Sequence, residues 1–220
     1  MLTVVVTEIE YRKAESAFVD TPRMTFVSAP NEEAPLAAAV RETGASGVIV
    51  GPQPYNSDLY RALLPGSILA RFGVGHDGID KAKATAAGIL CTNTPGTMVD
   101  SVAELTIALL LAASRRLLPM ATEMRSGVWN QQLGFEVNGA RLAVIGAGLI
   151  GRRVAVMASA GFDMRVTLCD RSVHRKATYE VPGVSVVATY DEAVDGADFV
   201  SMHIPGTEEN RNFLDRKSVV

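Results

Sequence analysis

The chain has 220 residues, enough for one large domain or for two small domains that each have a core. Hydrophobic residues make up 48% and charged residues 20% of the sequence, which is typical of globular proteins and excludes a disordered or fibrous chain. The net charge of -3 argues against a nucleic-acid-binding surface, which needs a basic stripe.

The sequence also predicts a cytoplasmic protein without a membrane segment. Its first residues lack a basic region and become acidic at Glu8, so no secretory signal is expected. The most apolar stretch, residues 103–113, contains Glu104 and spans 11 residues, whereas a bilayer-spanning helix needs about 20. Cys91 and Cys169 each lie in an apolar run and are expected to be buried free thiols in a reducing compartment.

Residues 1–100 alternate short β-branched runs with amphipathic stretches. Such alternation predicts an α/β domain with a parallel sheet covered by helices on both faces. The expected strands are residues 2–6, 24–27, 47–50, 67–72 and 89–92, and the expected helices are 11–18, 32–43, 57–64 and 80–87.

A long helix is expected after the break near residue 100. Asp100 or Ser101 is a candidate N-cap, and Glu104 stands three residues after Ser101, which fits a capping box. Apolar residues occur on nearly all sides of the helix up to residue 117, so most of its surface should be buried. We therefore expect this helix to link two domains and to pack against something large, such as a second subunit.

Strand and helix alternation resumes at residue 141. Strands are expected at 142–145, 165–169, 184–187 and 199–203, and helices at 149–160 and 190–194. A doubly wound sheet usually has about six strands. The sequence thus predicts residues 101–220 to be a second α/β domain that is incomplete in its C-terminal half.

A glycine-rich motif, Gly-Ala-Gly-Leu-Ile-Gly, occupies residues 146–151 between an expected strand and an expected helix. In a dinucleotide-binding loop, Gly146 would allow the tight turn, Gly148 would let the backbone approach a diphosphate, and Gly151 would let helix and strand pack closely. The diphosphate would then lie on the free N–H groups of the helix N-terminus. The motif and its flanks predict a Rossmann-type nucleotide site.

Asp170 ends the next expected strand and lies 19 residues after Gly151, where a carboxylate would accept hydrogen bonds from the adenosine ribose. A carboxylate there repels the 2′-phosphate of NADP, which favours NAD. Arg171, together with His174, Arg175 and Lys176, forms a basic cluster that could instead hold such a phosphate. NADP therefore remains the less favoured alternative.

Three segments upstream of this loop carry a family resemblance. They read RFGVGHDGID at 71–80, AAGILCTNTPG at 86–96 and SVAE at 101–104. In this order and spacing, and with the glycine motif after them, the chain resembles the D-isomer-specific 2-hydroxyacid dehydrogenase family along nearly its whole length. The resemblance implies a flavodoxin-like substrate domain over 1–100 and a partial Rossmann NAD-binding domain over 101–220.

The same resemblance implies an oxidoreductase that moves a hydride between a nicotinamide and a small 2-hydroxy or 2-oxo acid, in a homodimer joined through the 101–118 helix. The backbone at Val74, Gly75 and His76 would face the substrate carboxylate, and Asp80 would be a helix N-cap rather than a catalytic acid. No metal is implied. The expected cofactor-binding residues are Gly146, Gly148, Leu149, Ile150, Gly151, Asp170, Arg171, Ile204, Pro205 and Asn210.

The family's catalytic Arg, Glu and His are expected beyond Val220, so no catalytic residue is assigned within this chain. One interpretation is that the chain is the N-terminal part of a dehydrogenase and is inactive alone. The alternative is an NAD-sensing, non-catalytic module like the family's corepressor relatives. The identity of the 2-hydroxy acid is left open by the sequence.

Overall fold

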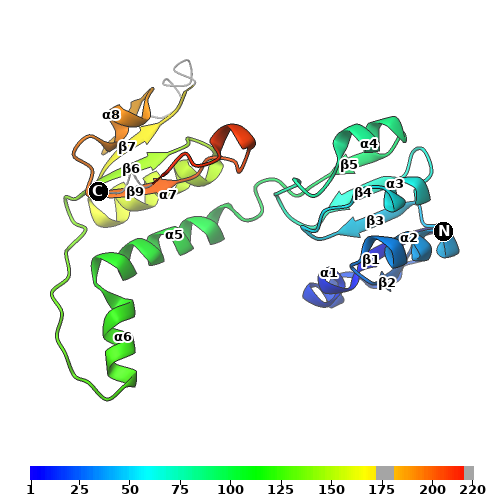
Figure 1. Cartoon of the computed structure of the whole chain (residues 1–220), viewed down its shortest axis with the longest axis horizontal. Helices are drawn as coiled ribbons and strands as arrows, with labels where there is room; N and C mark the ends of the chain where they lie inside the picture. Colours follow the sequence, from blue (N-terminus) through cyan, green and yellow to red (C-terminus); the bar gives the residue numbers. More distant parts are fainter. Residues whose placement is uncertain (172–180, 216–220) are drawn as a thin grey trace. The chain divides into compact units, whose positions relative to one another are not determined.

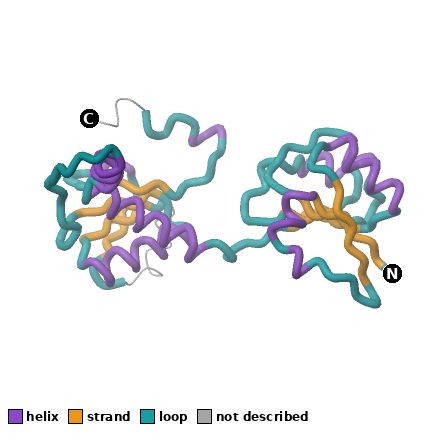
Figure 2. The backbone as a smooth tube through the Cα atoms, turned by 90° about the horizontal axis from the view of Figure 1, so that it is seen from below, coloured by secondary structure: helices purple, strands orange, loops and turns teal. Residues whose placement is uncertain are grey.

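The computed structural model describes residues 1–171 and 181–215. The chain divides into two compact units, and the boundary in the sequence falls between Met98 and Val99 (Figure 1). Each unit has its own parallel sheet, with its strands enclosed by helices (Figure 2). Each unit also has a hydrophobic core of its own.

The first unit has a five-stranded parallel sheet in the order β2-β1-β3-β4-β5, which is the flavodoxin-like order. Strands buried on both faces need continuous apolar runs, and the β1 and β3 sequences supply them. The elements are β1 (Leu2–Thr7), α1 (Glu8–Lys13), η1 (Glu15–Ala17), β2 (Met24–Ala29), α2 (Glu33–Thr43), β3 (Gly47–Val50), α3 (Asp58–Ala62), β4 (Ile68–Arg71), α4 (Lys81–Ala86) and β5 (Leu90–Thr92).

The start of α1 and the start of α4 can be compared with the helix boundaries expected from the sequence. The helix expected at 11–18 is wrong in position, because α1 starts directly after β1 and ends at Lys13. Acidic residues in its first turn and basic residues in its last turn match the helix dipole and explain this earlier start. The Asp80 prediction is confirmed, since its side chain accepts a 3.0 Å hydrogen bond from the Lys83 N–H at the start of α4.

The second unit has a four-stranded parallel sheet in the order β8-β7-β6-β9, the order of the first four strands of a doubly wound nucleotide-binding domain. Leu142 and Val144 of β6 pack in the core under α7, while Ala143 and Ile145 pack in a second core on the opposite face. The elements are α5 (Val99–Ser114), α6 (Leu117–Arg125), β6 (Arg141–Ile145), α7 (Leu149–Phe162), β7 (Arg165–Cys169), β8 (Val184–Val187), α8 (Tyr190–Val194), β9 (Phe199–Met202) and η3 (Glu208–Asn210).

The long helix differs from the expectation at both ends. It begins at Val99, so Asp100 and Ser101 both lie inside the first turn and neither is the N-cap. After Ser114 the chain breaks at Arg116, whose φ of 53° is left-handed, and continues as α6. Pro119 lies in the first turn of α6, where its missing N–H removes no intrahelical hydrogen bond.

The burial of α5 is one-sided. Its buried residues are Ala103, Ile107, Leu110 and Ser114, and the first three share a hydrophobic core with α7 at helical spacing. Leu105 and Leu109 are 59% and 62% exposed. The expectation that this helix is buried on nearly all sides is therefore wrong within the chain.

Two further sequence expectations concern the surface. Cys169 is buried, but Cys91 is exposed on β5, so the prediction of two buried thiols is correct only for Cys169. In the ranges 1–171 and 181–215, none of the helices combines the length and hydropathy that crossing a bilayer requires.

Candidate cofactor site

The glycine-rich turn joins β6 to α7, and its three glycines meet different surroundings. Gly146 has a φ of 105°, and a Cβ there would lie 2.5 Å from the His203 carbonyl oxygen. A Cβ on Gly151 would collide with the Gly146 carbonyl oxygen. A Cβ on Gly148 would meet nothing within 4 Å. Two glycines are thus required by packing, and Gly148 leaves open space beside the backbone.

The helix that follows is suited to an anion. Gly148 is the N-cap of α7, a helix of 14 residues, and contributes no side chain to cap its first turn. The first N–H groups of a helix lack intrahelical partners and carry the positive end of its dipole. A diphosphate above Gly148 would be held by these groups.

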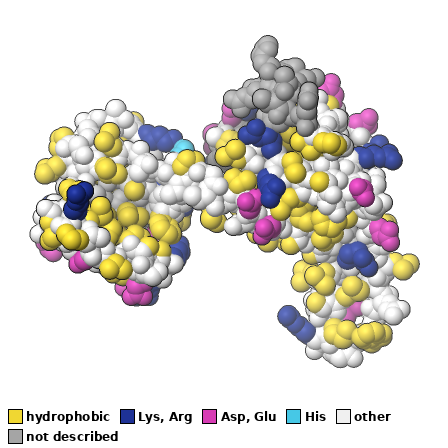
Figure 3. Space-filling model, turned by 180° about the vertical axis from the view of Figure 1, so that it is seen from behind, with side chains coloured by type: hydrophobic (Ala, Val, Ile, Leu, Met, Phe, Trp, Pro, Cys, Tyr) yellow, Lys and Arg dark blue, Asp and Glu magenta, His cyan; other side chains and the backbone are white. Residues whose placement is uncertain are grey.

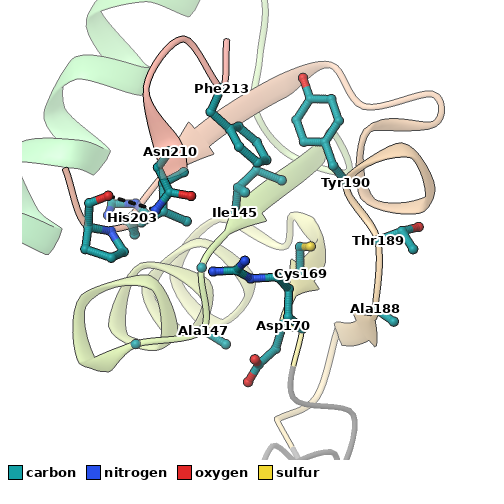
Figure 4. A pocket seen from close by; sticks show the side chains of 15 residues that line it. Ile145, Ala147, Cys169, Asp170, Ala188, Thr189, Tyr190, His203, Asn210 and Phe213 are labelled. Carbon is teal, nitrogen blue, oxygen red and sulfur yellow. Dashed lines mark hydrogen bonds between the residues drawn. The ribbon is translucent and has the colours of Figure 1, made fainter. Parts of the chain in front are cut away.

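A pocket of about 460 Å³ opens over this turn (Figure 4). Of the ten cofactor residues predicted from the sequence, Gly146, Gly148, Asp170, Arg171, Ile204, Pro205 and Asn210 line it. Leu149, Ile150 and Gly151 lie outside its lining, since they belong to the body of α7. The structure therefore brings together residues that are far apart in the sequence.

Asp170 and Arg171 enter the pocket from the end of β7. The Asp170 N–H donates a 3.0 Å hydrogen bond to the Val187 carbonyl, which fixes the backbone at this point. The Arg171 guanidinium lies 2.8 Å from a carboxylate oxygen of Glu209. The other members of the predicted basic cluster, residues 174–176, fall outside the described ranges.

The segment after β9 forms the facing wall. The His203 N–H donates to the Ile145 carbonyl at 2.7 Å, so the β6–β9 pairing extends to the pocket edge. The Asn210 side-chain amide donates to the Pro205 carbonyl at 2.9 Å, drawn as a dashed line in Figure 4. This bond holds η3 against the segment that carries Ile204.

Several pocket residues were missed by sequence reasoning. Tyr190 and Phe213 pack edge to face, with ring centroids 5.3 Å apart, and form an apolar wall (Figure 4). Thr189, just before Tyr190, forms a capping box with Glu192, and this local signal was readable in the sequence. His203 was not missed in this way, because its place at a strand end beside Ile204 and Pro205 predicts a position near the cofactor. It lines the pocket, burial lowers its pKa, and its Nε2 lies 2.9 Å from Ser201 Oγ.

The predicted substrate loop lies in the first unit, after β4. The Gly73 carbonyl accepts from the Thr94 N–H at 3.1 Å, and the Val74 carbonyl accepts from the Asn93 side-chain amide at 2.8 Å. A Cβ on Gly75 would meet nothing within 4 Å, so the backbone there is open to a ligand.

His76 lines a separate cavity of about 160 Å³, together with Cys91 and Asn93. Its Nδ1 is buried and has no hydrogen-bond partner within the part of the chain that is described. Across the same ranges, no group of three or more His, Cys, Asp or Glu residues is arranged to hold a metal ion. His76 therefore lies at the end of the predicted substrate loop and faces a small cavity.

Comparisons with known proteins agree with this geometry. Residues 107–219 match the family described as D-isomer specific 2-hydroxyacid dehydrogenase, NAD binding domain. A glyoxylate reductase from Korarchaeum cryptofilum is 36% identical over 167 residues, which cover 73% of this chain and 49% of that protein. A D-3-phosphoglycerate dehydrogenase from Mycobacterium leprae is 32% identical over 206 residues, covering 93% of this chain and 38% of that protein.

A solved structure, the TT0316 protein from Thermus thermophilus, superposes with a TM-score of 0.77 at 28% identity, over 99% of this chain and 69% of that one. The chain spans about half or less of the length of the two relatives named above. The family match, the parallel sheets and the glycine-rich pocket lead to one conclusion. The chain belongs to the D-isomer specific 2-hydroxyacid dehydrogenase family, and residues 107–219 belong to the NAD-binding domain of that family.

Proposed function

We propose that this chain is part of an NAD-dependent dehydrogenase that transfers a hydride between a nicotinamide and C2 of a small 2-hydroxy or 2-oxo acid. The observation that carries the proposal is the pocket that unites Gly148, Asp170 and Asn210 inside the family's NAD-binding domain. When bound, the nicotinamide cofactor supplies the hydride acceptor or donor. The relatives named as glyoxylate reductases favour a short 2-oxo acid as substrate.

Within this proposal the cofactor is NAD. The α7 N-terminus would bind the diphosphate, and the Asp170 carboxylate would accept hydrogen bonds from the ribose hydroxyls. A 2′-phosphate at the same place would be repelled by that carboxylate. The remaining predicted residues would surround the cofactor from the 204–210 segment and the first turns of α7.

The substrate carboxylate is proposed to bind the N–H groups at Val74, Gly75 and His76. Two observations support this role: the open space at Gly75, and the hydrogen bonds that tie the preceding carbonyls to residues 93–94. Main-chain N–H groups in such a loop suit a carboxylate because a glycine permits close approach.

We also propose that the 220 residues alone bind NADH without turning substrate over. The catalytic Arg, Glu and His that the family resemblance implies have no counterparts assigned in this sequence. The proposal further includes a cytoplasmic homodimer formed through residues 101–118, which belong to α5 and the start of α6. Leu105, Leu109 and Leu118 are more than half exposed on these helices, which supports an apolar contact there.

NADH fluorescence titration tests the cofactor assignment. The wild-type chain should bind NADH, and Asp170→Ala should weaken binding about 10- to 100-fold, because charged hydrogen bonds to the ribose are lost. Asp191→Ala, which changes an exposed acidic residue outside the pocket lining, is the matched control and should leave binding unchanged. With glyoxylate or hydroxypyruvate added, the NADH absorbance should stay constant. A dissociation constant near 1 mM is about the weak limit of specific binding. A wild-type chain that binds no NADH at about 1 mM NADH would therefore contradict the proposal.

A further inference from the structure

One ion pair at the cofactor pocket connects segments that are 38 residues apart. Arg171 follows Asp170 at the end of β7 and lines the pocket, while Glu209 lies in η3. The guanidinium Nη1 and the carboxylate Oε1 are 2.8 Å apart. The neighbouring Glu208 pairs instead with Arg211, at 3.0 Å. Only one of these two adjacent glutamates therefore acts on a pocket residue.

We propose that Glu209 is a specificity-determining residue that makes the pocket select NAD over NADP by engaging the Arg171 guanidinium. The inference rests on the proposed function, because it assumes that the ribose binds beside Asp170. It adds a residue that sequence reasoning did not assign to the site.

The chemistry of the two cofactors explains the selection. A 2′-phosphate carries about two negative charges and is best recognised by a guanidinium, which offers paired N–H donors. An arginine near the end of the second strand is the usual residue for this purpose. In this chain that arginine already faces a carboxylate, so a 2′-phosphate would have to displace Glu209 and would be repelled by it. The ribose hydroxyls of NAD make no such demand, since Asp170 can accept their hydrogen bonds.

Because both side chains of the ion pair are exposed, the pair should change cofactor affinity only modestly, and replacing either residue should not disturb folding. The Arg171 and Glu209 side chains are 74% and 72% exposed, so the pair contributes little to folding and is screened by salt. Glu209→Gln keeps the size of the side chain and removes its charge. The change should therefore alter cofactor preference without altering the fold.

The experiment titrates the full chain with NADPH and with NADH at low ionic strength, following nucleotide fluorescence. Glu209→Gln should raise NADPH affinity about two- to fivefold and leave NADH affinity unchanged, as expected for the loss of one exposed charge near the 2′-phosphate. Glu208→Gln, the matched control one residue earlier, should leave both affinities unchanged. Adding Arg171→Gln to Glu209→Gln should abolish the gain, because the freed guanidinium is its source.

The results distinguish failure of the role of Glu209 from failure of the proposed function. Wild-type NADH binding with an unchanged NADPH to NADH ratio in Glu209→Gln would overturn the inference alone. A gain that persists without Arg171 would do the same, since it would reflect general charge rather than the freed guanidinium. Absence of NADH binding by the wild-type chain would overturn the proposed function and this inference with it. Unchanged circular dichroism spectra would show that the variants fold.

Discussion

Gly148 and Gly151 belong to one motif but have different roles, one in binding and one in packing. Replacing each with alanine should distinguish these roles. A Cβ at Gly148 enters open space, and its φ of -68° suits any residue. Gly148→Ala should therefore fold normally yet bind NADH more than about tenfold more weakly, because the methyl group occupies the approach of the diphosphate. Gly151→Ala should lower the free energy of unfolding by about 1–3 kcal/mol, because its Cβ collides with a backbone carbonyl.

Urea unfolding and NADH titration of both variants check this pair. A Gly148→Ala chain that binds NADH as well as the wild type would contradict the assignment of the open space to the diphosphate. Equal stability of Gly151→Ala and the wild type would show that the turn relaxes around the added methyl group.

Residues whose role depends on local sequence could be predicted. The turn glycines, the Asp80 N-cap and the position of Asp170 at a strand end follow from spacing and backbone rules. Tyr190 and Phe213 could not be predicted, because their pairing depends on the return of a distant segment over the sheet edge. The Arg171–Glu209 pair was missed for the same reason.

At the scale of elements, one carboxylate on α2 holds the start of α3. Glu33 accepts hydrogen bonds from the backbone N–H groups of Asn56, Ser57 and Leu59, at 2.7–3.2 Å. Glu33→Ala should lower the free energy of unfolding by about 2 kcal/mol at pH 7, because charged capping bonds are lost. Glu32→Ala, which removes an exposed neighbour that makes no side-chain cap bond, should have little effect in the same urea experiment.

The stabilisation by Glu33 should depend on pH. Burial alone would raise the pKa of this carboxyl, but the backbone N–H donors outweigh it, so the pKa lies below its ordinary value of 4.5. Below pH 4.5 the unfolded chain therefore binds more protons here than the folded chain, and stability falls as pH drops through the folded pKa. The difference between wild type and Glu33→Ala should be full above pH 4.5 and shrink below it. A difference that stays constant down to about pH 3, well below the ordinary pKa of a glutamate, would exclude this role.

The sequence predicted the elements of the second unit closely, because each strand there is a short apolar run with a clear break after it. It was less successful with the long helix. Apolar residues on all sides of a helix predict that the helix is buried on all sides. In the structure, the described residues bury one face of α5, the face with Ala103, Ile107, Leu110 and Ser114. Leu105 and Leu109 stay exposed on the other face, and the proposed dimer would cover them.

At the scale of the whole molecule, this exposed apolar surface leads to the prediction of a dimer. Figure 3 shows hydrophobic side chains gathered over the projecting α6 segment and the surface next to it. Leu105 and Leu109 lie one turn apart on the solvent side of α5. Replacing both with Glu places charges in the proposed apolar interface, where their desolvation strongly opposes association. The variant should be a monomer when light scattering is measured after size exclusion, whereas the wild type should have twice the mass of the chain.

Leu64→Glu is the matched control for this change, because Leu64 is 71% exposed in the first unit, away from α5 and α6 in the sequence. It adds a similar charge and should leave the dimer intact. A wild-type chain that is monomeric at about 50 μM, a concentration at which even a micromolar interface is formed, would contradict the dimer. A dimer that survives the Leu105 and Leu109 changes would place the interface elsewhere. Loss of the dimer only in the α5 variant would explain why so apolar a helix keeps Leu105 and Leu109 exposed in the single chain.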